Sequence, residues 1–159
     1  MNGNGELTFR KATKQDLPTV YTIEKESFKD PYPPFLIDLL LRLNPEAFLV
    51  VEESGEILGY VVASQNRNEG NIVSIAVSPR YRGKEIGRRL MAEVLSILKK
   101  SGVETVRLEV RKSNTSAQHF YEVLGFEYNH DAIGYYGDED AKVYYKALTL
   151  SPKEHSMKC

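Results

Sequence analysis

Residues 75–90 have the sequence IAVSPRYRGKEIGRRL, in which an apolar strand runs through a basic, glycine-containing turn into a long amphipathic helix. The first N–H groups of a helix lack partners within the helix and carry partial positive charge, so this turn favours an anion, typically a phosphate. Four basic side chains add to that charge: Arg82, Lys84, Arg88 and Arg89. The turn is not a P-loop, because Gly83-Lys84 is followed by Glu85, and a GxGxxG fingerprint is absent.

On both sides of this stretch the chain alternates short predicted elements. β-rich runs predict strands over residues 6–10, 48–52, 57–64, 72–77, 103–110, 126–130 and 142–148, with a turn at 68–71. Helical spacing of apolar residues predicts helices over 17–28, 35–43, 86–101 and 117–124, the first preceded by an N-cap at Thr13 with an acidic residue three places on. The 159 residues are the length of one domain, and the element order predicts a mixed α/β fold with hairpins first and crossover helices later.

Composition narrows the classes of partner. The 21 basic and 22 acidic residues nearly balance, which disfavours nucleic acid as the main partner. The single cysteine, Cys159, is typical of a reducing compartment, and three histidines without cysteine pairs argue against zinc. The most apolar stretch, residues 35–43, is too short to span a membrane, and the first residues lack a secretory signal pattern. We therefore expect a cytoplasmic protein that binds neither metal, nucleic acid nor membrane.

Two further stretches of sequence contain residues that could take part in catalysis or binding. Residues 108–114 have the sequence LEVRKSN and continue through Ala117, Phe120-Tyr121-Glu122 and Leu124-Gly125-Phe126-Glu127, and residues 135–141 have the sequence YYGDEDA. Together with Arg82 and Gly87, which match an Arg/Gln-x-x-Gly-x-Gly/Ala loop, these blocks resemble the GNAT superfamily of N-acetyltransferases over nearly the whole chain. The spacing of these motifs is most similar to that in the branch of archaeal protein N-terminal and ribosomal-protein-alanine N-acetyltransferases.

The resemblance implies an α/β, single-domain acyl-CoA N-acyltransferase (GNAT) fold over residues 6–149, whose mixed central sheet is flanked by about four helices. Residues 1–5 and 150–159 are expected to be flexible ends. The implied reaction transfers an acetyl group from acetyl-CoA to the α-amino group of a protein or peptide N-terminus, by direct attack and without a metal. Implied partners include ribosomal proteins or an auxiliary subunit, and the chain would act as a monomer or weak dimer.

The same resemblance assigns roles to individual residues. Glu109 would be the general base, acting through a water, and Tyr121 the general acid that protonates the CoA thiolate. The residues implied to bind acetyl-CoA are Ile75, Ala76, Val77, Arg82, Gly83, Lys84, Glu85, Ile86, Gly87, Arg88, Asn114 and Tyr121. The residues implied to bind the acceptor are Asp30, Tyr32, Tyr135 and Tyr136, with Glu24 or Glu26 as alternatives to Asp30 for attracting the α-ammonium group.

One position departs from the family pattern. The middle glycine of the family's loop is Glu85 here, and a glutamate is strained if that position needs a positive φ. The Glu85 carboxylate would also bring negative charge toward the pyrophosphate of CoA. We therefore expect weaker CoA binding than with glycine, unless Glu85 points to solvent or pairs with Arg88 or Arg89.

Each assignment has a structural alternative. Glu109 could be a solvent-facing strand residue, Tyr121 a core aromatic, and Asn114 a helix N-cap as well as a CoA ligand. The tyrosines of the acceptor side could simply pack their loops onto the core. At the level of function, the alternatives are an acetyltransferase for a small free amine, such as a polyamine or amino acid, and a CoA-binding module without catalysis.

Overall fold

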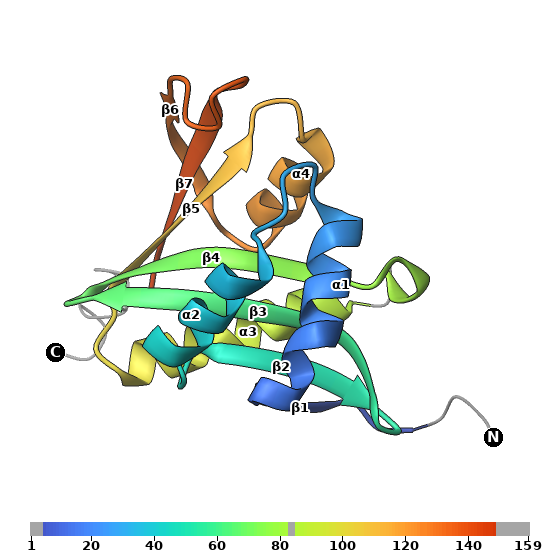
Figure 1. Ribbon diagram of the computed structural model, residues 1–159. Helices are drawn as coiled ribbons and strands as arrows, with labels where there is room; N and C mark the ends of the chain where they lie inside the picture. The colour runs from blue at the N-terminus through green and yellow to red at the C-terminus, as the bar shows by residue number, and fades with distance from the viewer. Residues whose placement is uncertain (1–4, 83–84, 149–159) are drawn as a thin grey trace, which may run out of the picture. The chain divides into compact units, whose positions relative to one another are not determined.

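The computed structural model describes residues 5–82 and 85–148. Within these residues, seven strands form a sheet in the order β1-β2-β3-β4-β5-β7-β6 (Figure 1). The strands are β1 (Thr8–Lys11), β2 (Phe48–Glu53), β3 (Glu56–Asn66), β4 (Glu69–Val77), β5 (Thr105–Arg111), β6 (Glu127–Ala132) and β7 (Ala141–Ala147). The helices are α1 (Leu17–Ser27), α2 (Pro34–Leu43), α3 (Ile86–Lys100) and α4 (Thr115–Val123), with short 3₁₀ turns η1 (Lys14–Asp16) and η2 (Pro79–Tyr81). The predicted mixed α/β class and element order are confirmed.

The chain packs as two compact units. The first contains the residues up to Ser64 together with Ile72–Leu98, and the second contains Gln65–Asn71 together with the chain from Lys99 onward. Strands β3 and β4 contribute residues to both units. The predicted flexible ends lie, apart from Gly5, outside the described residues.

In the first unit, α1 and α2 lie on one face of strands β2–β4 and α3 lies on the other (Figure 1). The capping box predicted at Thr13 is present: the Thr13 N–H donates to the Asp16 carboxylate at 2.7 Å. Arg10 donates to the same carboxylate at 2.8 Å, and this hydrogen bond lowers the pKa of Asp16. The inner side of α3 is apolar, and its buried residues are Ile86, Leu90, Met91, Val94 and Leu98. Gly59 permits close strand packing, because a Cβ there would lie 2.8 Å from the Ala76 carbonyl oxygen.

The second unit is built around β5, whose side chains alternate between a buried and a partly buried face. Val106, Leu108 and Val110 are buried, whereas Thr105, Arg107, Glu109 and Arg111 share the other face. Strand β5 pairs in parallel with residues 69–71 of β4 and antiparallel with β7, which in turn pairs antiparallel with β6. Successive side chains of a strand point to opposite faces, so Arg107, Glu109 and Arg111 all point to the same side of β5.

Several predicted strand boundaries were wrong. Strand β4 begins at Glu69 and not at Ile72, since the chain reverses at Arg67–Asn68, where Arg67 adopts a φ of 59°. Residues 69–71 are Glu, Gly and Asn, which are typical of a turn, yet they pair with Thr105–Arg107 of β5. Strand β5 begins at Thr105, two residues later than predicted, and β6 extends to Ala132 although its first four residues are exposed.

Two tyrosines donate hydrogen bonds to glutamates, and the stability of the fold should therefore depend on pH in the alkaline range. Tyr60 donates to Glu24, and Tyr144 donates to Glu122 at 2.8 Å. Burial raises the pKa of Tyr60 well above its usual value and the pKa of Tyr144 to about 12. In the unfolded chain tyrosine ionises near pH ~10.

We therefore expect the free energy of unfolding to fall as the pH rises from about 10 to about 12, because the unfolded state releases the proton first. Urea unfolding across this range measures the fall. The free energy of unfolding should fall less steeply with pH in Tyr144→Phe than in the unmodified chain. Equal slopes would contradict the raised pKa of Tyr144.

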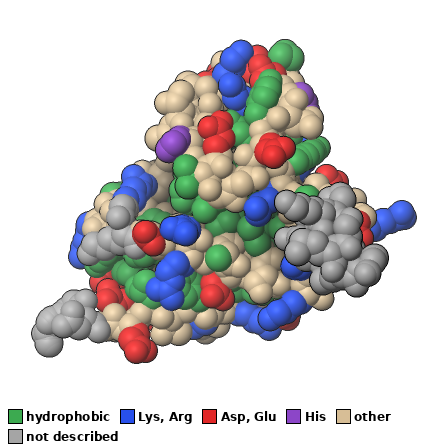
Figure 2. Space-filling model, turned by 180° about the vertical axis from the view of Figure 1, so that it is seen from behind, with side chains coloured by type: hydrophobic (Ala, Val, Ile, Leu, Met, Phe, Trp, Pro, Cys, Tyr) green, Lys and Arg blue, Asp and Glu red, His purple; other side chains and the backbone are tan. Residues whose placement is uncertain are grey.

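Charged side chains of both signs are interspersed on the face of the molecule in Figure 2. Among the described residues, no helix has the length and apolar character needed to cross a membrane. In the same part of the chain, no group of three or more His, Cys, Asp or Glu side chains is placed to hold a metal ion.

Candidate active site

The turn after β4 is anchored through Arg82. The Arg82 Nε donates to the carbonyl oxygen of Val77, the last residue of β4, at 3.0 Å, and its Nη2 donates to Ser27 Oγ at 2.9 Å. The guanidinium therefore ties the turn to the ends of both β4 and α1. Ile75, Ala76 and Val77 are the last three residues of β4, while Gly83 and Lys84 lie outside the described residues.

Helix α3 begins directly after Glu85, whose carbonyl oxygen accepts the Arg89 N–H at 3.1 Å. The N–H groups of Ile86, Gly87 and Arg88 precede this first intrahelical bond, so they belong to the end of the helix that suits an anion. Ile86 is only 2% exposed, and its side chain packs in the core.

Glu85 adopts a φ of 64°, so the strain expected at the family's glycine position is present. Its side chain is 71% exposed and lies 3.8 Å from the Arg88 guanidinium. The carboxylate is exposed to solvent and weakly paired, which reduces its repulsion of a bound anion without removing it. The backbone strain is unaffected by this pairing.

We expect Glu85→Gly to raise the free energy of unfolding by about 1 kcal/mol, because glycine adopts a positive φ without a steric penalty. We also expect a lower KM for acetyl-CoA, measured from initial rates of thiol release. Glu85→Ala is the matched control, since it removes the charge and keeps the strain. A KM in Glu85→Gly equal to or above that of the unmodified chain would contradict the expectation.

Glu109 lies on the partly buried face of β5, where two neighbours hold its carboxylate. Arg107 Nε donates to Oε2, and Asn71 Nδ2 donates to Oε1 at 3.2 Å. The Glu109 side chain is only 9% exposed, so the alternative of a solvent-facing strand residue does not describe it. The hydrogen bond to Glu109 raises the pKa of Arg107, which keeps the guanidinium charged beside the carboxylate. Sequence reasoning missed both partners.

Tyr121 lies on α4 and packs edge-on against two aromatic rings. The ring centroids of Phe120 and Phe126 lie 5.3 Å and 6.0 Å from that of Tyr121. Burial raises the pKa of Tyr121 to about 12. At neutral pH the phenol is therefore protonated and can donate a hydrogen bond.

Asn114 caps α4, as the structural alternative predicted. Its side-chain oxygen accepts the Ala117 N–H at 3.2 Å and the Ser116 hydroxyl at 3.3 Å. This cap fixes the start of the helix that carries Tyr121.

Tyr135 and Tyr136 lie in the loop between β6 and β7 (residues 133–140). Their rings meet edge-on with centroids 4.8 Å apart, and the Tyr135 residue is 51% exposed. Burial raises the pKa of Tyr135, and the charge of Glu109 adds to that shift. The loop thus carries a half-exposed phenol within electrostatic reach of Glu109.

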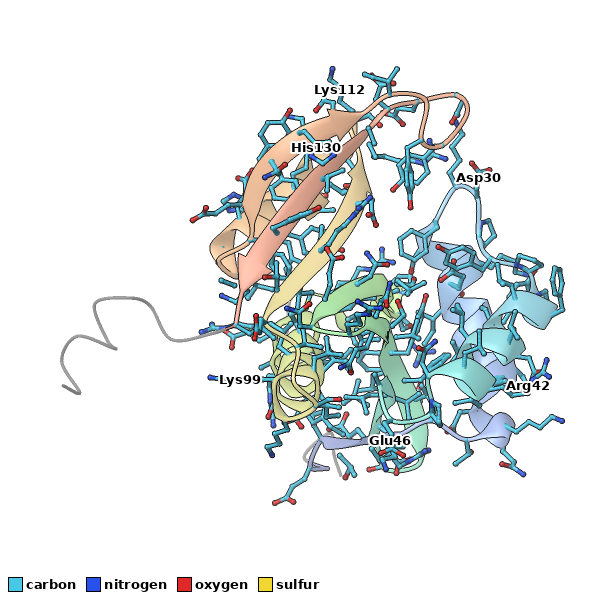
Figure 3. The ribbon with its side chains drawn as sticks, turned by 90° about the vertical axis from the view of Figure 1, so that its left-hand side faces the viewer. Asp30, Arg42, Glu46, Lys99, Lys112 and His130 are labelled. Carbon is cyan, nitrogen blue, oxygen red and sulfur yellow. The ribbon has the colours of Figure 1, made fainter. Side chains whose placement is uncertain are left out.

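The loop between α1 and α2 is held by a buried carboxylate. Glu24, only 2% exposed, accepts hydrogen bonds from the Tyr60 hydroxyl, from Ser74 Oγ at 3.0 Å and from the Tyr32 N–H at 2.9 Å. Asp30 lies at the turn of this loop (Figure 3). Sequence reasoning missed Tyr60 and Ser74, although Ser74 is a polar residue at a buried register position of β4.

Comparisons with known proteins agree with this architecture. A model of the acetyltransferase (GNAT) family matches residues 17–126. The chain is 36% identical over 137 residues to an uncharacterised N-acetyltransferase of Methanocaldococcus jannaschii, which covers 85% of this chain and 88% of that relative. It is 32% identical over 150 residues to an N-alpha-acetyltransferase of Sulfurisphaera tokodaii, with coverage of 86% and 90%. The crystal structure of Ard1 from Thermoplasma volcanium is similar with a TM-score of 0.87 and 33% identity, covering 91% of this chain and 99% of that one.

The chain therefore belongs to the GNAT acetyltransferase family, as its sequence motifs predicted. It is an acetyltransferase.

Proposed function

We propose that this protein transfers an acetyl group from acetyl-CoA to the α-amino group of protein N-termini. The observation that carries the proposal is the carboxylate of Glu109 on β5, which is only 9% exposed and is held by Asn71 and Arg107. In addition to burial, its negative charge contributes to the raised pKa of Tyr135. The similarity to an archaeal N-alpha-acetyltransferase supports the choice of acceptor. The single cysteine of the chain supports a cytoplasmic location.

The residues at the start of α3 fit the phosphates of acetyl-CoA. The N–H groups of Ile86, Gly87 and Arg88 stand at the positive end of a helix, and Arg88 adds charge beside them. We propose that Gly83, Lys84 and Glu85 also bind acetyl-CoA. The backbone N–H groups of Ile75–Val77 would hold the acetyl and pantetheine part and polarise the thioester carbonyl.

Glu109 would act on the incoming amine. An α-ammonium group has a pKa of about 7.7–8.0, so a modest base is enough to produce the free amine. The ammonium proton would pass through a water to Glu109, and the free amine would then attack the thioester carbon. As the amide forms, the nitrogen would lose its second proton to solvent. The C–N bond forms, the C–S bond breaks, and CoA leaves as a thiolate.

Tyr121 would stabilise that thiolate as a hydrogen-bond donor. The pKa of Tyr121 is raised to about 12. The ordinary pKa of a thiol is about 8.5, so complete transfer of the phenol proton to the thiolate is uphill. We therefore assign Tyr121 the donation of a hydrogen bond, with the thiol proton coming finally from solvent. Asn114 would support Tyr121 by capping α4, in addition to any contact with CoA.

The residues proposed to bind the acceptor are those that the sequence resemblance implies. We propose that Tyr32, Tyr135 and Tyr136 contact the peptide and that Asp30 attracts the α-ammonium group. Glu24, whose two carboxylate oxygens already accept three hydrogen bonds, is better suited to holding Tyr32 than to binding the amine directly.

A panel of acceptors tests the proposed function. Thiol release from acetyl-CoA would be measured with short peptides beginning with Ser, Ala, Thr, Gly, Met-Leu or Met-Glu, and with spermidine and a free amino acid. Release that depends on a peptide supports the proposal and defines its sequence preference. Release with the small amines alone would assign the protein to small-amine acetylation, and no release despite CoA binding would indicate a non-catalytic module.

A further inference from the structure

Arg111 is the last residue of β5, and its side chain is only 16% exposed. The strand register places it at the base of the β6–β7 loop, because Ala141 pairs with Arg111 on one side and with Ala132 on the other. Lys112, the next residue, lies at the same end of the sheet as this loop (Figure 3). A charged side chain that is mostly buried requires partners.

Arg111 contacts three residues of the β6–β7 loop: Tyr136, Asp138 and Glu139. Its Nη1 donates to Asp138 Oδ1 at 3.0 Å and to Glu139 Oε1 at 3.1 Å. Its guanidinium carbon also lies 4.3 Å from the centre of the Tyr136 ring. One guanidinium thus combines two ion pairs with a cation–π contact, and every one of these contacts restrains the same loop.

Glu139 extends the connection beyond Arg111. Its second carboxylate oxygen accepts the Ser113 N–H at 2.6 Å. Hydrogen bonds from the Ser113 side chain, from Arg111 and from the Ser113 N–H lower the pKa of Glu139. Its carbonyl oxygen accepts the Tyr136 N–H at 3.0 Å. Glu139 therefore links the segment after β5 to the backbone of Tyr136.

The consequence is a fixed position for the tyrosine pair. Tyr136 is restrained through its ring by Arg111 and through its N–H by Glu139. Tyr135 packs edge-on against Tyr136 and lies within electrostatic reach of Glu109. Arg111 and Glu109 are two residues apart on the same face of β5, so the strand that carries the proposed base also carries the anchor of the loop.

We propose that Arg111 and Glu139 form a clasp that fixes the β6–β7 loop and so positions Tyr135 and Tyr136 for the acceptor peptide. The inference rests on the proposed function, in which these two tyrosines contact the acceptor. Arg111 is a positioning residue in this scheme and touches neither acetyl-CoA nor the acceptor. Without the clasp, binding of the peptide must also order the loop, which weakens binding of the peptide and leaves binding of acetyl-CoA unchanged.

The test uses Arg111→Met, which keeps much of the apolar stem and removes the charge. Lys112→Met is the matched control, since Lys112 is the neighbouring cation and pairs with Asp131 at 3.3 Å. We expect Arg111→Met to raise the KM for the peptide about tenfold with an unchanged KM for acetyl-CoA. Amide hydrogen exchange of residues 134–137 should also become faster. Lys112→Met should alter neither quantity.

Unchanged exchange in Arg111→Met would overturn the clasp. Faster exchange with an unchanged peptide KM would overturn its positioning role. If Arg111→Met does not fold, Glu139→Gln provides the same two measurements from the loop side, with changes in the same directions. Failure of the proposed function would appear in the unmodified protein, as an absence of peptide-dependent thiol release, before any variant is compared.

Discussion

Replacement of Glu109 by Gln should lower kcat for peptide acetylation about 100-fold at neutral pH, which is the lower part of the range for a general base. The amide has the size of the carboxylate, and its oxygen can still accept a hydrogen bond from Asn71 or Arg107. What it loses is the ability to take a proton. Initial rates of thiol release at saturating acetyl-CoA measure the change, and Glu127→Gln, at an exposed glutamate of β6, is the control.

The pH dependence of that loss distinguishes a base from a merely structural residue. The α-ammonium group has a pKa of about 7.7–8.0, so above pH ~9 most of the acceptor already carries a free amine. The rate deficit of Glu109→Gln should therefore shrink as the pH rises from 7 to 9. A deficit of constant size over this range would contradict the assignment of Glu109 as the base.

Replacement of Glu24 by Ala should lower the free energy of unfolding by about 3 kcal/mol, since a buried donor left without a partner costs about 1–3 kcal/mol. The change removes the acceptor for three donors: the Tyr60 hydroxyl, the Ser74 hydroxyl and the Tyr32 N–H. The hydroxyls of Tyr60 and Ser74 lie 2.9 Å apart and can still bond to each other, which limits the loss.

Urea unfolding at pH 7 measures this effect. Glu26→Ala is the matched control, because Glu26 lies two residues further along α1 and is exposed. It should change the free energy of unfolding by less than about 0.5 kcal/mol. A loss in Glu24→Ala as small as that of the control would show that the network contributes little to stability.

Local chemistry predicted much of the fold. The capping box at Thr13, and the glycines that follow two of the helices, are signals contained within a few residues. Gly102 and Gly125 adopt φ values of 96° and 95°, which is the conformation that lets glycine end a helix. The strand–turn–helix around residues 75–90 is equally local, so its motif could be recognised and the strain at Glu85 anticipated.

The polar networks could not be predicted in the same way, because their members are distant in sequence. Asn71 meets Glu109 across 38 positions, and Ser74 meets Glu24 across 50. These contacts depend on strand order and register, which the periodicity of a single segment does not determine. For the same reason the clasp between Arg111 and Glu139, 28 positions apart, becomes visible only in the folded chain.

The measurement that tests the account most directly compares two peptides of identical sequence, one with a free α-amine and one with that amine formylated, each containing an internal lysine. Thiol release from acetyl-CoA would be followed with the unmodified protein. The proposed function predicts release with the free peptide and none above background with the blocked one. Equal release from both peptides would contradict acetylation of the α-amine.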